Sequence, residues 1–307
     1  MKVLLVAAKI CLLFTILAHP TSVTTQSPHQ ASSPSVRAML DARAPALLAK
    51  YRVASVGVAL IEDGRVVLER AYGEQSPGVP ATTATLFNLA SLTKPVAAEV
   101  LLRLTAAGRL SLDEPMAPHW VDPDVAADPR HLRLTLRLAL SHQTGLPNWR
   151  GRSPGGRLGF VFAPGTAFGY SGEGYDYAAR FAERKLGRGF EALAEELVFG
   201  PLGMASTSFS ARGWMRGRLA VPLDSAGHWG EPQVQEAGKW NAGNNMITTA
   251  GDYGRFLVSV MRGEGLTPAL AAERLRPARG PQPAWTCRVV APGATYTSRL
   301  PRRTYLI

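Results

Sequence analysis

Residues 88–104 read NLASLTKPVAAEVLLRL, and the interpretation of the whole chain depends on this stretch. Ser91 and Lys94 stand three residues apart, and apolar residues recur at helical spacing from Val96 to Leu104. Serine is a common residue at the start of an ordinary buried helix. The stretch alone therefore leaves two interpretations open: a nucleophilic serine with its activating lysine, or a helix N-terminus without chemistry.

The side chains of Ser91 and Lys94 are expected to lie side by side, because residues three apart share one face of a helix. A helix N-terminus also favours negative charge that develops near it. The predicted helix is apolar after Lys94 except at Glu99 and Arg103, which indicates that it is largely buried. A lysine at the start of a buried helix needs a partner or a chemical role, which favours the catalytic interpretation.

A second serine lies in GRSPG at residues 151–155, which matches the G-x-S-x-G pattern of other hydrolases. That pattern presents a nucleophile only at a sharp turn from a strand into a helix. Pro147 and a further glycine flank the match, and neither a strand nor a helix is predicted beside it. Ser153 is therefore interpreted as a chance match.

Tyr170 lies in PGTAFGYSGEGY, residues 164–175, just before a predicted helix. A glycine-rich loop of this kind lets a side chain project into a cleft. Taken alone, the residue is better interpreted as a turn tyrosine packed on the surface.

The composition is that of a globular protein with a sizeable core, because 46% of the 307 residues are hydrophobic. The net charge of +11 is not clustered in the middle of the chain, so a nucleic-acid partner is not expected. The two cysteines, Cys11 and Cys287, allow no disulfide framework or cysteine metal site, and the histidines show no ligand spacing. We expect neither a metal nor another cofactor.

Residues 1–18 resemble a secretory signal peptide, with Lys2 ahead of an apolar run that only Lys9 interrupts. The uninterrupted run at 10–18 is shorter than the about 20 residues that a membrane span needs. We therefore expect an exported protein without a stable membrane span, with an uncleaved N-terminal anchor as the alternative. Residues 19–36 are rich in Ser, Thr and Pro, which predicts a flexible linker.

Two strand-like runs, residues 53–61 and 65–72, are joined by Asp-Gly and predict a β-hairpin. The first run is apolar nearly throughout, so both of its faces should be covered. Residues 132–140 fit a helix or a strand equally. Helical patterns, without alternating strand–helix units, predict an α+β fold, and they occupy residues 173–186, 189–199 and 251–261.

Five motifs stand in a fixed order along residues 37–262. They are Ser91-Leu-Thr-Lys94, LSHQTGLP at 140–147, PGT at 164–166 with YSGEGY at 170–175, PLGM at 201–204, and AGNNMITTA at 242–250. In this order they resemble the β-lactamase-related serine hydrolases, which include class C β-lactamases, DD-peptidases (penicillin-binding proteins), D-aminopeptidases and related esterases.

The resemblance implies a β-lactamase/transpeptidase-like fold, in which an antiparallel sheet is flanked by helices and a helical domain is inserted between its two halves. Ser91 would be the acylated nucleophile, and its N–H would form half of the oxyanion hole. Lys94 would hold the serine proton or favour the ionised form of its neighbour, and Tyr170 would be the base. Gly172 stands where the family often has a substrate-binding Asn, which makes a β-lactamase less favoured than a peptidase or esterase acting on a small-molecule or peptide substrate.

The family's third motif, Lys or His followed by any residue and Gly, is absent after residue 250. Residues 265–307 are instead rich in Arg and Pro, and Glu273 is their only acid. We therefore expect a β-lactamase-related domain at 37–264 whose last strands are missing, followed by an atypical tail from a truncation or a frame change, or from real divergence. The expected function is that of a serine hydrolase, with a catalytically impaired penicillin-binding-like module as the alternative.

Overall fold

The computed structural model describes residues 32–224, 226–276 and 304–306 of the chain. The strands are β1 (Ser55–Glu62), β2 (Arg65–Ser76), β3 (Val79–Pro80), β4 (Phe87–Asn88), β5 (Ile247–Thr248) and β6 (Thr304–Leu306). The helices are α1 (Ser32–Tyr51), α2 (Thr93–Ala106), α3 (Leu136–Leu140), α4 (Gly172–Leu186), α5 (Phe190–Ala194), α6 (Ala250–Arg262) and α7 (Pro268–Arg274). Short turns of helix are η1 (Ala90–Leu92), η2 (Pro123–Val125), η3 (Pro129–Arg133), η4 (Arg150–Arg152), η5 (Pro154–Gly156), the π-helical η6 (Glu195–Phe199) and η7 (Gly213–Met215).

The main sheet is antiparallel, with the strand order β3-β2-β1-β6. Its centre is the predicted hairpin of β1 and β2, which turns at Asp63 and Gly64, both with positive φ. The predicted hairpin is therefore confirmed. A second, two-stranded antiparallel sheet pairs β4 with β5 and carries the chain into η1.

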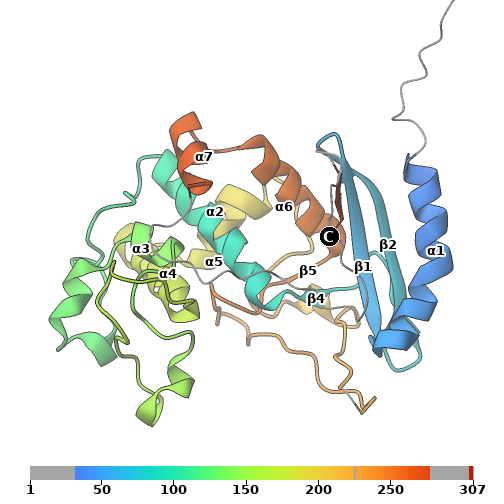
Figure 1. The fold of residues 1–307 in the computed structure, drawn as a ribbon, viewed down its shortest axis with the longest axis horizontal. Coiled ribbons are helices and arrows are strands. Elements are labelled where there is room, and N and C mark those ends of the chain that lie inside the picture. The colour runs from blue at the N-terminus through green and yellow to red at the C-terminus, as the bar shows by residue number, and fades with distance from the viewer. Residues whose placement is uncertain (1–31, 225, 277–303, 307) are drawn as a thin grey trace, which may run out of the picture.

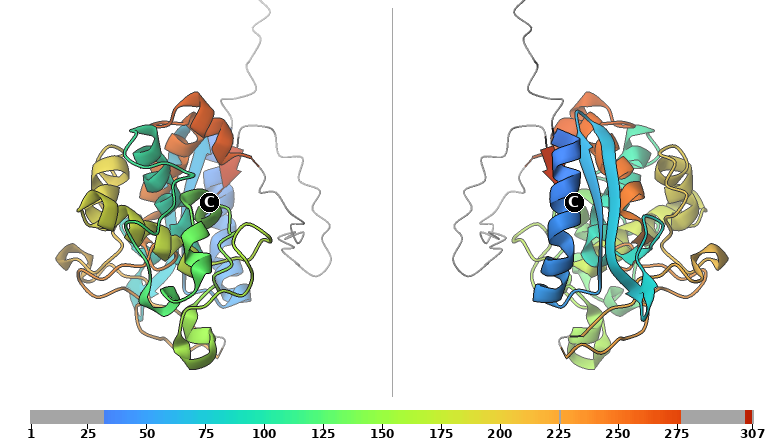
Figure 2. Two further views of the ribbon diagram at one scale, coloured as in Figure 1. Left: turned by 90° about the vertical axis from the view of Figure 1, so that its left-hand side faces the viewer. Right: turned by 90° about the vertical axis from the view of Figure 1, so that its right-hand side faces the viewer.

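Helices cover both faces of the main sheet (Figures 1 and 2): α1 contacts β2 on one side, and α6 contacts β1 and β2 on the other. This explains why β1 is apolar along most of its length. Gly57 of β1 allows a close approach here, because a Cβ at this position would lie 2.9 Å from the Phe87 ring and 3.1 Å from the Ala250 methyl.

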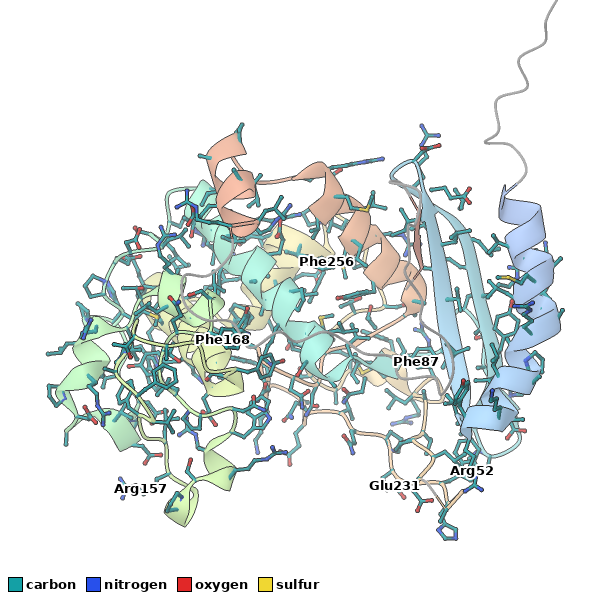
Figure 3. All side chains as sticks on the ribbon, in the orientation of Figure 1. Arg52, Phe87, Arg157, Phe168, Glu231 and Phe256 are labelled. Carbon is teal, nitrogen blue, oxygen red and sulfur yellow. The ribbon has the colours of Figure 1, made fainter. Side chains whose placement is uncertain are left out.

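The helical part lies beside α6, away from the sheet (Figure 1). Its core is one apolar cluster built mainly from α2, α4, α5 and α6, in which Phe181, Phe190 and Phe256 are fully buried. Figure 3 shows Phe256 on α6. The chain between β3 and α6 supplies most of this part, so the helices are inserted between segments that belong to the sheet layer. The expected α+β architecture is confirmed in this respect.

Local details differ from the sequence-based expectations in several places. The range 132–140, which fitted a helix or a strand, contains the end of η3 and the short helix α3, so it is helical and not a strand. The predicted helix at 189–199 changes from α5 to the π-helical η6 at Glu195. Helix α1 begins at Ser32, inside the range 19–36 interpreted as a linker, and the range 265–307 contains α7 and β6.

The predicted signal segment, residues 1–18, lies outside the described residues, as do residues 277–303 of the predicted tail. Within the described part of the chain, no helix combines the length and the apolar character that crossing a bilayer requires.

Candidate active site

The turn that carries Ser91 connects β4 to α2 and is held from several sides. Ala90 adopts a φ of 44°, and its N–H donates to Oδ1 of Asn88 at 2.7 Å. The Thr93 hydroxyl donates to the Ala90 carbonyl at 2.5 Å and accepts the N–H of Met246 at 3.0 Å. Ser91 is exposed at the start of this turn of helix, directly ahead of α2.

Lys94 lies one turn further on, and its side chain is buried at 3% exposure. Its Nζ donates to Ser91 Oγ at 3.1 Å and to the Gly243 carbonyl at 2.6 Å. The predicted contact between the serine and the lysine is therefore present. The buried ammonium has partners on two sides, one of which comes from a distant part of the chain.

Three aromatic rings surround the same ammonium. The Nζ of Lys94 lies 4.7 Å from the ring centre of Tyr170, 5.4 Å from that of Trp149 and 6.0 Å from that of Tyr175. Cations over aromatic faces at such distances are attracted by the ring quadrupole. Ser91, Lys94 and Tyr170 thus meet at one place, because Lys94 Nζ contacts both the serine hydroxyl and the tyrosine ring.

The imidazole of His142 packs against the ring of Tyr170. Its ring lies 4.5 Å from that of Tyr170 and 5.2 Å from that of Tyr175, and its Nδ1 accepts the N–H of Ser171 at 3.1 Å. Burial, and then the charge of Lys94, lower the pKa of His142 to about 4. The imidazole is therefore neutral at neutral pH, and because Nδ1 is an acceptor, the proton resides on Nε2.

Gly172 is the first residue of α4 and follows Tyr170 by two positions. A Cβ at residue 172 would lie 2.3 Å from one ring atom of Trp149 and 2.6 Å from two others. Real Cβ contacts are not that short, so Trp149 occupies the space that a side chain at position 172 would need. The residue to which the resemblance assigns substrate binding thus contributes only backbone here.

The loop that provides the Gly243 carbonyl is fixed by Asp176 of α4. Oδ1 of Asp176 accepts the N–H of Ala242 at 2.6 Å, and burial of this carboxyl raises the pKa of Asp176 to about 7. Further along the loop, Asn245 adopts a φ of 69°, and its Oδ1 accepts from the Asn88 amide at 3.3 Å. The loop therefore connects α4 to the turn that carries Ser91.

Ser153 lies between the short turns η4 and η5, with no strand before it. Arg157, which follows these turns, stands at the edge of the molecule (Figure 3). The sharp turn from a strand into a helix that the G-x-S-x-G pattern needs is therefore not formed around Ser153.

Sequence reasoning did not single out Trp149, Asp176 or Gly243 as parts of the site. Trp149 stands two residues after the motif that ends at Pro147, and Gly243 lies within the motif at 242–250; this proximity to the motifs was the only signal in the sequence. Asp176 lies one residue beyond the end of the YSGEGY motif and carried no signal of its own.

A sequence profile of the Beta-lactamase family matches residues 40–297, which is most of the chain. The chain belongs to the Beta-lactamase family. The match includes the residues that form the site and extends into the segment that follows α7.

Among members of the Beta-lactamase family, esterase EstB from Burkholderia gladioli is 28% identical, over 79% of this chain and 74% of the esterase. The D-alanyl-D-alanine-carboxypeptidase/endopeptidase AmpH from Escherichia coli K12 is 29% identical, over 52% of this chain and 47% of AmpH. The chain therefore spans about half of AmpH and about three quarters of EstB. Their names support hydrolase chemistry of the serine type in general.

The fold also matches solved structures of the Beta-lactamase family. The D-alanine carboxypeptidase AmpC from Burkholderia cenocepacia superposes with a TM-score of 0.65 at 22% identity, over 78% of this chain and 68% of that one. The expected β-lactamase/transpeptidase-like fold is thereby confirmed.

Proposed function

We propose that this protein is a serine hydrolase that forms an acyl-enzyme on Ser91 and cleaves ester or amide bonds. The observation that carries the proposal is the 3.1 Å contact between Lys94 Nζ and Ser91 Oγ, made by a buried ammonium. Family membership and the esterase and peptidase names of the relatives support the same class of chemistry.

In this proposal, Ser91 Oγ attacks the carbonyl carbon of the substrate, and its proton passes to Tyr170 in its phenolate form, whose negative charge the Lys94 ammonium stabilises. The Ser91 N–H stabilises the oxyanion of the tetrahedral intermediate. The proton taken from Ser91 then passes to the leaving alcohol or amine, as the single bond between the carbonyl carbon and the leaving oxygen or nitrogen breaks. Water then attacks the acyl-enzyme, which releases the acid and restores the Ser91 hydroxyl.

The substrate is proposed to be a small ester or a peptide rather than a β-lactam. Gly172 offers no side-chain amide with which to bind a substrate amide, and Trp149 fills the space above it. A site built to hydrogen-bond a substrate group discriminates strongly for that group, and this site lacks the group at position 172.

The test measures covalent labelling by a fluorophosphonate probe and hydrolysis of p-nitrophenyl esters. Both are compared among the wild type, Ser91→Ala and Ser153→Ala. We expect one adduct, mapped to Ser91 by mass spectrometry, and ester hydrolysis that Ser91→Ala abolishes and Ser153→Ala retains. An adduct on Ser153, or hydrolysis that survives Ser91→Ala, would refute the assignment.

A second candidate is a penicillin-binding-like module that acylates but turns over slowly. The observation that favours it is the absence of a Lys-x-Gly or His-x-Gly motif after residue 250. Losing one oxyanion donor typically costs about 100- to 1,000-fold in turnover. A burst of one equivalent of p-nitrophenol without steady release would support this candidate, whereas multiple turnovers would exclude it.

Export is also proposed, on the basis of the signal-like residues 1–18. N-terminal sequencing of the protein isolated from its own cells tests this proposal. A cytoplasmic product that keeps Met1 would contradict it.

A further inference from the structure

Trp149 contacts three parts of the site at once. Its six-membered ring occupies the space beside Gly172, where a Cβ would lie 2.3 Å away. It also lies beside Gly243, where a Cβ would be 3.1 Å from the ring, and the Nζ of Lys94 is 5.4 Å from the ring centre. The indole is only partly buried, and its ring borders the ammonium that contacts Ser91 Oγ.

The residues on either side hold Trp149 in this position. The backbone carbonyl of Asn148 accepts the N–H groups of Gly172 and Glu173, both at 3.1 Å, and the Asn148 Oδ1 also accepts from Gly172 at 3.0 Å. The backbone N–H and the guanidinium of Arg150 both donate to the Glu173 carboxylate, at 2.8 to 3.0 Å. The loop is thus bound to the start of α4 immediately before and after the indole, so the ring is a fixed wall.

We propose that Trp149 is a specificity-determining residue that forms an aromatic wall for the acyl group of the substrate. The inference rests on the proposed function and names its substrate class: esters whose acyl group carries an aromatic or other apolar substituent next to the carbonyl. Acyl groups that carry an amide at that position, as those of peptides do, are disfavoured, so the inference narrows the proposed ester or peptide class to esters.

The physical reason for this preference is that the apolar indole of Trp149 stands where a polar amide side chain at position 172 would otherwise contact the acyl group. A side-chain amide at position 172 would pair with a substrate amide, but the indole has no acceptor and presents mainly carbon. A substrate amide pressed against it loses water without gaining an equivalent partner, which is unfavourable. A phenyl group placed there gains aromatic contact and leaves no polar group unsatisfied.

The test compares three p-nitrophenyl esters that share one leaving group: acetate, phenylacetate and N-acetylglycinate. The wild type should prefer phenylacetate over acetate in kcat/KM. Trp149→Ala should lower this preference by about fivefold to tenfold, and Trp149→Phe should restore most of it. Adding Gly172→Asn to Trp149→Ala should raise the preference for N-acetylglycinate over acetate.

Preference ratios are measured because general damage to the fold lowers all three rates together and leaves their ratios unchanged. Trp214→Ala is the matched control, since Trp214 lines a separate cavity of about 490 Å³ with Glu191 and Phe199, and it should leave the ratios unaltered. Rates of Ser91→Ala are subtracted as the blank. If the wild type shows no Ser91-dependent hydrolysis of any ester, the proposed function fails and the inference with it. If hydrolysis depends on Ser91 but Trp149→Ala leaves the phenylacetate preference intact, the inference alone is overturned.

Discussion

Gly172→Ala should destabilise the protein, although the same change at an ordinary helix position has the opposite effect. Replacing a helical Gly with Ala usually stabilises by about 0.5–1 kcal/mol, because the unfolded chain loses freedom. At residue 172 the new methyl carbon would lie 2.3 Å from a ring atom of Trp149 and 2.6 Å from two more. Overpacking of this kind costs about 1–3 kcal/mol. The clash therefore outweighs the entropic gain, by about 1 kcal/mol or somewhat more.

Urea denaturation followed by circular dichroism measures the effect as a lower midpoint with an unchanged slope. In a Trp149→Ala background the obstructing ring is gone, so Gly172→Ala should become neutral or stabilising, with a coupling of at least about 1 kcal/mol between the two sites. Gly213→Ala is the control, since Gly213 is also the first residue of a helical turn and a Cβ there meets nothing within 4 Å. If Gly172→Ala stabilises the wild type, or if its cost persists without the indole, the ring does not lie over residue 172.

Three further outcomes are expected. Lys94→Ala should lower Ser91-dependent hydrolysis by at least about 100-fold, measured as kcat/KM, whereas Lys239→Ala, which removes an exposed lysine, should not; equal rates in both would contradict the role of Lys94. Because the pKa of Asp176 is raised to about 7, the folded state keeps a proton that the unfolded chain loses near pH 4, so stability should fall as the pH rises from about 4 to about 7; Asp176→Asn should flatten this part of the profile and be more stable than the wild type at pH 8, and an unchanged profile would contradict it. Arg150→Ala should destabilise by about 1–3 kcal/mol, because it leaves buried carboxylates without their partner; a midpoint within error of the wild type would show that the ion pairs are not formed in solution.

The parts that could be predicted from the sequence are those governed by short-range geometry. The Asp-Gly turn determined the hairpin, and the spacing of three residues placed Lys94 beside Ser91 at 3.1 Å. The burial of Lys94 also followed from the apolar helix after it. These features follow from the regular spacing of side chains along a helix or a strand, which neighbouring residues in the sequence determine.

The parts that could not be predicted depend on contacts between distant segments. The second partner of Lys94 is the carbonyl of Gly243, which is 149 residues away in the chain. The indole of Trp149 reaches Gly172 only because loop and helix pack together, and the sequence alone shows a missing side chain at 172 but not what takes its place. Helix α7 and strand β6 lie in a range whose composition carries little periodicity, so local patterns did not indicate them.

The backbone of Ala90 has a consequence for how this protein responds to selection. A left-handed conformation costs a non-glycine residue about 1–2 kcal/mol, and Ala90 adopts it immediately before Ser91. Ala90→Gly would relieve that strain in the folded state, which exceeds the about 0.5–1 kcal/mol that the greater freedom of the unfolded chain costs, so a screen for heat resistance alone would tend to recover it. The same change would widen the range of orientations open to the serine hydroxyl, so the heat-resistant variant is expected to be the poorer catalyst. Stability and reactivity are thus set against each other at one residue, and a laboratory evolution experiment that selects for both should leave alanine in place.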